Sequence, residues 1–383
     1  MNIGILYPRS KTHSELAFDF LDGLKAFIKE QNLTNEFRLF SESVGFGGAE
    51  KEVYEKAEKL LLIESVDVLI AYIDQRVMGI LTPLFFASGK LILIVNPGAN
   101  YPLNWIPQKN IVNLTLQHAF LCWLSGKDAG RQTNNEAALL TTYYDCGYLH
   151  GTAIIKSFIK EKGTISFNYV NNQAYDENFH INELKDFLLA NKTTTNLLCI
   201  CDSLPALLVY QQLNKFERAT ELKFFVSPMM LEPKAIEHLK EGYHFSIEGY
   251  MPWLPVSETD ANKKFTDFYR QHTKREAGIF SLLGWETGMI LQQVYNDSNE
   301  NFDDGAAITE QLSKIKMDSP RGELKMDPAT QYFLAPVVKC VVENNAVKMK
   351  TEIIETYEKE WLAFTGEPTE GIISGWMNTY LCY

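Results

Sequence analysis

Short apolar runs, each followed by a polar loop and then by an amphipathic segment, alternate along the chain up to about residue 250. The clearest runs are residues 2–6, 66–71 and 91–95, which lead into polar loops at residues 7–13, 72–76 and 96–101. Such alternation is typical of parallel strands joined by helical crossovers. In sheets of this kind, small molecules bind at the carboxyl ends of the strands, where these loops lie. The search for function therefore starts at the loops.

The apolar periodicity predicts two successive α/β units. For the first unit we expect strands at 2–6, 37–40, 66–71 and 91–95, with helices at 14–30 (Ser14 as its N-cap), 49–63 and 77–87. For the second we expect strands at 137–141, 164–170, 197–201 and 224–227, with helices at 149–162, 178–190 and 206–213. The pattern then changes to consecutive helices at 260–274 and 282–294 and an antiparallel pair at 337–342 and 347–353. The predicted fold class is α/β, with two doubly wound parallel sheets.

Composition narrows the classes of protein. The 383 residues are 46% hydrophobic and 22% charged, which suits two soluble domains. The net charge of -12, with scattered Lys and Arg, argues against nucleic-acid and anionic-membrane partners. We expect the six cysteines to be core residues. No apolar run reaches the roughly 18 residues of a membrane span. No signal peptide precedes the first strand, so the protein is either cytoplasmic or an export signal was removed.

Several fragments, in their order and spacing, resemble one known family. They lie at residues 3–6, 18–24, 66–70, 95–99, 262–265, 283–288 and 319–324. The most specific is the Ser-Pro-Arg-Gly segment at 319–322, which precedes a strand. On these fragments the chain is similar to type I periplasmic solute-binding proteins of the branched-chain amino acid (Leu/Ile/Val) group, over nearly its whole length.

The resemblance implies two lobes joined by three crossing strands near 116–120, 245–252 and 322–328. The N-terminal lobe would comprise residues 1–118 and 249–325, and the C-terminal lobe residues 119–248 and 326–383. A ligand would bind in the cleft between lobes, which close by hinge motion. The partner would be the membrane permease of an ABC importer. The protein would then be periplasmic, or lipid-anchored outside the cytoplasmic membrane.

In the first lobe, three loops carry the candidate ligand-binding residues Ser10, His13, Asp74, Gln75, Arg76, Asn96, Gly98, Asn100 and Tyr101. The resemblance implies that the loops after the third and fourth strands hold a ligand carboxylate with hydroxyls and backbone N–H groups. Gln75 and Asn100 stand at those positions and can donate through their amides, with the Gly98 backbone nearby. Arg76 can bind a carboxylate through two parallel hydrogen bonds. The alternative for each charged residue is that it is a solvated charge on a loop or forms a salt bridge between the lobes.

In the second lobe, the candidates are Tyr148, Asp202, Ser203, Met229 and Tyr250. Tyr148 occupies the family's aromatic position, and Ser203 replaces a second aromatic residue. Met229 and Met230 stand where the family holds a ligand amine with a carboxylate. Burying an ammonium group without a carboxylate is costly, so an aliphatic α-amino acid is doubtful unless Asp202 or Asp74 takes that role. Tyr250 either lines the pocket or packs at the hinge.

The sequence carries no motif for catalysis, for a metal or for a cofactor. It lacks a complete dinucleotide loop, a phosphate loop, a Gly-x-Ser-x-Gly elbow and a His-Glu-x-x-His pair. We therefore expect a monomeric, non-enzymatic receptor without cofactor that binds a small amino-acid-like, amide or carboxylate ligand. The alternatives are a cytoplasmic or signalling sensor of the same fold and an α/β enzyme.

Overall fold

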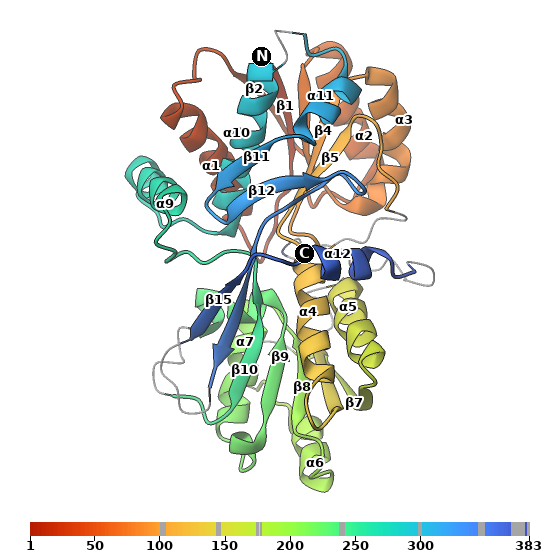
Figure 1. Ribbon diagram of the computed structural model, residues 1–383, viewed down its shortest axis with the longest axis vertical. Helices are drawn as coiled ribbons and strands as arrows, with labels where there is room; N and C mark the ends of the chain where they lie inside the picture. The colour runs from red at the N-terminus through yellow and green to blue at the C-terminus, as the bar shows by residue number, and fades with distance from the viewer. Residues whose placement is uncertain are drawn as a thin grey trace. The chain divides into compact units, whose positions relative to one another are not determined.

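The chain forms two compact units in a computed structural model (Figure 1). The structure describes residues 1–99, 105–142, 147–173, 176, 178–236, 242–297, 301–343, 349–368 and 380. Unit 1 comprises Met1–Leu116, Trp253–Pro336 and Tyr380, and unit 2 comprises Gln117–Pro252 and the described residues from Val337 onward to 368. The chain therefore passes from one unit to the other after Leu116, after Pro252 and after Pro336, and it is back in unit 1 at Tyr380.

Unit 1 contains a sheet of eight strands among its described residues. Their order is β11 (Lys316–Ser319), β12 (Gly322–Asp327), β13 (Tyr332–Leu334), β5 (Ile111–Thr115), β4 (Leu91–Asn96), β3 (Val68–Tyr72), β1 (Asn2–Tyr7) and β2 (Arg38–Ser43). The strands β1 to β5 run parallel, as expected for β1 to β4 from their apolar runs, whereas β5 was not predicted. β12 pairs antiparallel with β11 and β13, and Gly322 with a φ of +103° forms the tight turn between β11 and β12. The segment near 322–328 thus lies within the sheet of unit 1, and the passage to unit 2 comes later.

Helices cover both faces of this sheet (Figure 1). They are α1 (Leu16–Glu30), α2 (Glu50–Glu58), α3 (Met78–Ser88), α9 (Asp260–Thr273), α10 (Ile279–Asp297) and α11 (Gly305–Leu312), with a π-helical turn η1 (Lys59–Ile63) and a 3-10 turn η2 (Gln75–Val77). The predicted N-cap Ser14 was wrong, because α1 begins after Glu15. Side chains of α2 and α3 form one apolar cluster with Leu69 and Ala71 of β3, whereas Tyr72 contacts Phe20 of α1.

The helices α1 and α10 pack closely because small residues face each other. A Cβ atom on Gly284 would lie 2.0 Å from the Phe20 carbonyl oxygen, so only glycine permits this approach. Glu286, two residues further along α10, is fully buried and pairs with Arg321. The Arg321 Nε and Nη2 atoms donate to the two Glu286 carboxylate oxygens at 2.8 and 2.7 Å. Arg321 Nη1 also donates to the Thr115 carbonyl at 3.2 Å, which ties the turn before β12 to the end of β5.

Unit 2 contains a second sheet, with seven strands among its described residues. Their order is β15 (Lys350–Ile354), β14 (Val337–Val342), β10 (Ser246–Met251), β9 (Lys223–Val226), β8 (Asn196–Ile200), β6 (Glu136–Thr142) and β7 (Thr164–Asn171). The predicted antiparallel pairing of β14 with β15 is confirmed. The helices are α4 (His118–Gly130), α5 (Gly147–Lys160), α6 (Asn182–Ala190), α7 (Ser203–Asn214), α8 (Pro233–Ile236) and α12 (Glu358–Thr365), with 3-10 turns η3 (Ala219–Glu221) and η4 (Pro228–Leu231). The α/β fold class with two mixed, mainly parallel sheets is confirmed.

Candidate functional site

Three loops at the carboxyl edge of the unit 1 sheet are joined by backbone hydrogen bonds. In the loop after β2, the Gly45 carbonyl accepts a hydrogen bond from the Arg9 N–H at 2.5 Å. The Val44 N–H of the same loop donates to the Tyr7 carbonyl at 3.0 Å. On its other side, the Asp74 N–H donates to the Gly47 carbonyl at 3.1 Å. The predicted loops after β1 and β3 therefore meet through the loop after β2, which was not predicted to belong to the site.

Asp74 and Arg76 form a charged pair at this edge. Asp74 is fully buried, whereas the Arg76 side chain remains about a third (35%) exposed. Arg76 donates to Asp74 Oδ2 through Nε at 2.9 Å and through Nη2 at 2.6 Å, and its backbone N–H donates to Oδ1 at 2.9 Å. The predicted pair therefore lies together, with the carboxylate holding one edge of the guanidinium. Gln75 belongs to η2 between them, and its side chain lies outside the described part of the structure.

The loop after β2 needs its glycines. Gly47 has a φ of +81°, and a Cβ atom there would lie 3.4 Å from the Ile73 Cα atom and 3.3 Å from the Asp74 nitrogen. A Cβ atom on Gly48 would lie 2.7 Å from the Phe46 ring and 3.2 Å from Arg76 Nη2. Since a side chain at residue 48 would collide with the ring, glycine allows Phe46 and the guanidinium to lie beside this backbone.

The loop after β1 contains Ser10 and His13. The Ser10 hydroxyl accepts a hydrogen bond from the His13 N–H at 3.0 Å and so shapes the turn. The His13 ring is buried and lies edge-on to Tyr380 at 4.9 Å and to Phe280 of α10 at 6.1 Å between ring centroids. Packing of the His13 ring is thus the role that the structure shows, and its two aromatic neighbours were not predicted.

The loop after β4 begins with Asn96, whose side chain is buried. Its Oδ1 accepts the Gly98 N–H at 2.7 Å, and Gly98 has a φ of +78°. The Gly98 N–H, which was predicted to bind a ligand, is therefore already used within this turn. The other two candidates of this loop, Asn100 and Tyr101, lie outside the described residues.

In unit 2, candidates lie at the carboxyl ends of β8 and β9. Asp202 is 8% exposed, and its carbonyl accepts the Ala206 N–H in the first turn of α7. Met229 is fully buried in η4, which follows β9. Ser203 begins α7 and Tyr148 lies in the first turn of α5, but the structure describes neither side chain.

Tyr250 belongs to a buried polar network of unit 2. Its hydroxyl donates to Asp128 Oδ2 of α4 at 2.7 Å, and burial, together with the Asp128 charge, raises the pKa of Tyr250 strongly. Lys339 of β14 donates to Asp128 and to Glu248 of β10, each at 2.7 Å. Glu248 also pairs with Lys223 of β9 at 2.8 Å. The hydroxyl of Tyr250 thus holds α4 on the sheet.

The family model described as Periplasmic binding protein matches residues 1–338. The chain belongs to the periplasmic binding protein family. A search of curated proteins finds no match. Periplasmic binding proteins of this type bind small solutes and serve ABC transporters.

Solved structures share the fold of this periplasmic binding protein. The solute-binding protein of an ABC transporter from R. palustris, solved in complex with benzoate, gives a TM-score of 0.69 at 16% identity and covers 92% of this chain and 95% of its own. A substrate-binding protein from Sphaerobacter thermophilus gives a TM-score of 0.73 at 13% identity. The match covers 93% of this chain and 96% of that protein. A leucine-binding protein from Thermotoga maritima gives a TM-score of 0.67 at 13% identity. The match covers 94% of this chain and 99% of that protein. At these identities the likeness shows the fold, which is the type I periplasmic binding protein fold.

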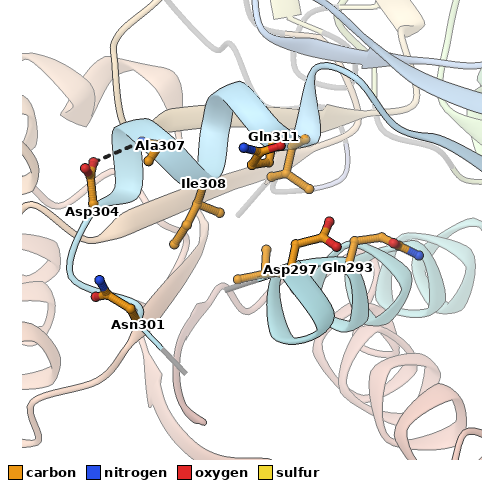
Figure 2. Close-up of a pocket in the computed structure, with 9 residues that line it drawn as sticks. Gln293, Asp297, Asn301, Asp304, Ala307, Ile308 and Gln311 are labelled. Atoms are coloured by element: carbon orange, nitrogen blue, oxygen red, sulfur yellow. Dashed lines mark hydrogen bonds between the residues drawn. The ribbon is translucent and has the colours of Figure 1, made fainter. Parts of the chain in front are cut away.

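One cavity of about 220 Å³ lies between α10 and α11 of unit 1 (Figure 2). Its polar lining includes Asp297, Gln311 and Asp304, whose carboxylate caps α11 by accepting the Ala307 N–H. The Gly305 N–H donates to the Gly89 carbonyl, just before β4, so the cavity lies at the amino end of the parallel strands. Ligands of such sheets bind at the opposite edge.

Two further features are absent from the described residues. No helix among them has the length and apolar character needed to cross a membrane. Within the same ranges, no group of three or more His, Cys, Asp or Glu side chains is arranged to hold a metal ion.

Proposed function

We propose that this periplasmic binding protein is an extracytoplasmic receptor that binds a small carboxylate- or amide-bearing molecule for an ABC importer. The observation that carries the proposal is the Arg76 guanidinium, which Asp74 holds at the carboxyl edge of the unit 1 sheet. A guanidinium held in this way can bind a carboxylate through two hydrogen bonds. No chemical step on the ligand is part of this role, and the receptor acts as a monomer.

The loop after β9 supports a ligand without an ammonium group. Met229 and Met230 fill it, and both are fully buried. A buried ammonium ion needs a paired carboxylate, which these thioethers cannot supply. Three similar solved structures from R. palustris are complexes with benzoate, 3,4-dihydroxybenzoic acid and 4-hydroxybenzoate, and a fourth is described as a branched-chain amino acid transporter. A similar structure from Streptococcus pneumoniae is a complex with isoleucine. Aromatic carboxylates and branched-chain amino acids are therefore the two ligand classes to compare first.

A thermal-shift screen tests the proposal. The panel contains benzoate, 4-hydroxybenzoate, benzamide, leucine, isoleucine, short amides and sugars. A ligand that binds only the native state at 100 times its Kd stabilises it by about 2.7 kcal/mol. We expect a carboxylate or amide to raise the Tm, and isothermal titration calorimetry followed by mass spectrometry to recover that ligand unchanged. Stabilisation by sugars alone, or conversion of the ligand, would contradict the proposal.

A further inference from the structure

The C-terminal part of the chain lies outside the match to the family. The family model matches residues 1–338, whereas α12 and Tyr380 follow in the sequence. The helix α12 packs on α4 of unit 2, and Lys156 Nζ of α5 donates to the Pro368 carbonyl at 2.6 Å. Tyr380, by contrast, belongs to unit 1. The contacts that Tyr380 makes there are therefore a feature of this chain, beyond the part that the family model describes.

The Tyr380 side chain is buried against two aromatic rings of unit 1. Its ring lies edge-on to His13 at 4.9 Å and to Phe280 at 5.2 Å between centroids, with interplanar angles of 89° and 90°. His13 and Phe280 also lie edge-on to each other, at 6.1 Å. Edge-to-face pairs at such separations stabilise a contact beyond the area that they bury. Because Tyr380 is only 1% exposed, its ring is docked in a socket rather than resting on the surface.

The His13 side of this socket lies at the candidate ligand-binding edge. His13 belongs to the loop after β1, at the carboxyl end of the strand, where ligands of parallel sheets bind. Backbone hydrogen bonds join this loop to the loop after β2 and, through that loop, to Asp74. An aromatic side chain from outside the family match therefore covers a residue that was predicted to contact a solute.

The backbone at Tyr380 favours a contact that can be broken. Its φ is +69°, a left-handed conformation that is unfavourable for a bulky side chain and offsets part of the gain from docking the ring. Only a short stretch of sequence separates Tyr380 from Pro368, which is held in unit 2. A group on a short connection acts at an effective concentration of about millimolar order. The ring can therefore compete with a dissolved molecule and still be displaced by it.

We propose that Tyr380 is an intramolecular plug: its ring occupies the place beside His13 and Phe280 that the apolar part of a solute takes, so that a solute binds only by displacing it. This inference rests on the proposed function, to which it adds an autoinhibitory contact. The plug raises the solute concentration at which the receptor fills. It also selects against solutes that bind too weakly to displace a phenol ring.

Calorimetry with the panel members, benzoate and leucine first, compares the parent protein with Y380A. If the ring is docked about nine-tenths of the time, its removal should raise the affinity for the solute on the order of tenfold. Y380F keeps the ring and should stay within about twofold of the parent affinity. The matched control is Y332A, because Tyr332 is also a buried tyrosine of unit 1 but its ring contacts Trp105. That variant should not bind more tightly than the parent.

A second measurement uses p-cresol, which is the tyrosine side chain as a free molecule. Removing the Tyr380 ring leaves a cavity lined by aromatic rings, and apolar cavities of this kind bind small aromatic molecules. Millimolar p-cresol should therefore raise the Tm of Y380A but not that of the parent or of Y380F. In Y380A, p-cresol should also compete with benzoate or leucine, since both occupy the place beside His13. Circular dichroism checks that each variant is folded, and Y380L repeats the comparison with a smaller cavity if Y380A is not.

The outcomes separate this inference from the proposed function. Tighter binding by Y380A, or binding by Y380A alone, supports the plug. If Y380A binds the solute as the parent does, or more weakly, Tyr380 does not block the site, and the plug is wrong although the receptor role stands. The same holds if p-cresol stabilises Y380A without competing with the solute, because the socket then lies apart from the ligand. If neither the parent nor Y380A binds any carboxylate or amide of the panel, the proposed function itself fails.

Discussion

Replacing Arg321 by methionine should destabilise unit 1 more than any exposed charge substitution. In the folded chain the Arg321 side chain is 1% exposed and Glu286 is 0% exposed, so the substitution leaves a carboxylate buried without its cation. Breaking such a pair by removing one partner costs about 3–5 kcal/mol. The Thr115 carbonyl also loses its hydrogen bond from Nη1, which moves the expected loss toward the upper end of this range.

Urea denaturation followed by far-UV circular dichroism measures the loss, with the transition of unit 1 fitted separately if the two units unfold in two steps. The single variants R321M and E286L should each lose several kcal/mol. The double variant E286L/R321M should recover most of the loss, because a buried ion pair replaced by apolar side chains of similar volume is often neutral or stabilising. R270M is the matched control, since Arg270 pairs with Glu276 at an exposed position. That variant should lose no more than about 1 kcal/mol.

Two results would refute this reasoning. If R321M is no less stable than R270M, the pair does not hold the turn before β12 in place. If the double variant is as unstable as the sum of the single variants, the loss comes from packing volume rather than from an uncompensated charge.

Two other predictions concern buried polar groups. Burial raises the pKa of Tyr72 strongly, and its hydroxyl has no hydrogen-bond partner among the described residues, so Y72F should keep or raise the free energy of unfolding; a loss above about 1 kcal/mol would contradict this. Burial pushes the pKa of Glu248 up, but Lys223 and Lys339 outweigh it and hold the pKa below the usual 4.5. Glu248 therefore contributes stability above pH 4.5 that is lost as pH falls through its folded pKa. In urea titrations from pH 3 to 7, E248Q should lose less stability on acidification than the parent protein, and an equal loss would contradict the assignment.

The parallel strands were predicted well because each is an apolar run bounded by polar loops. The strand β5 was missed, since Asn113 interrupts its short run, although that residue is 9% exposed in the sheet. The helix α4 was also missed, because it is buried on nearly all sides and shows no alternation of apolar and polar faces. The predicted helix at 178–190 begins later, at Asn182, because residues 179–181 are not helical and the His180 carbonyl accepts a hydrogen bond from Asn171 Nδ2 at 3.2 Å.

The candidate site was predicted in part. Ligands of parallel sheets bind at the carboxyl ends of the strands, which located the loops but did not predict the hydrogen bonds within and between them. Asp74 and Arg76 lie together as a pair, whereas Gly98 and His13 satisfy their polar or aromatic groups within unit 1. The Gly45–Gly48 loop was not predicted, because its glycines match only part of a dinucleotide-binding pattern. The signal that could have identified this loop was its three glycines, Gly45, Gly47 and Gly48, shortly after a predicted strand. The position of the ligand between lobes stays a prediction.

The pairing of β13 with β5 has a consequence for biosynthesis. Phe333 lies beside Leu114, so one edge of β5 stays open while the whole of the Gln117–Pro252 segment emerges from the ribosome. An unpaired strand edge is a template for misassembly, and pairings between residues far apart in sequence form slowly. A nascent chain halted before residue 332 should therefore carry an unfinished unit 1. We expect chaperones that bind exposed strand edges to protect the chain until β13 has paired with β5.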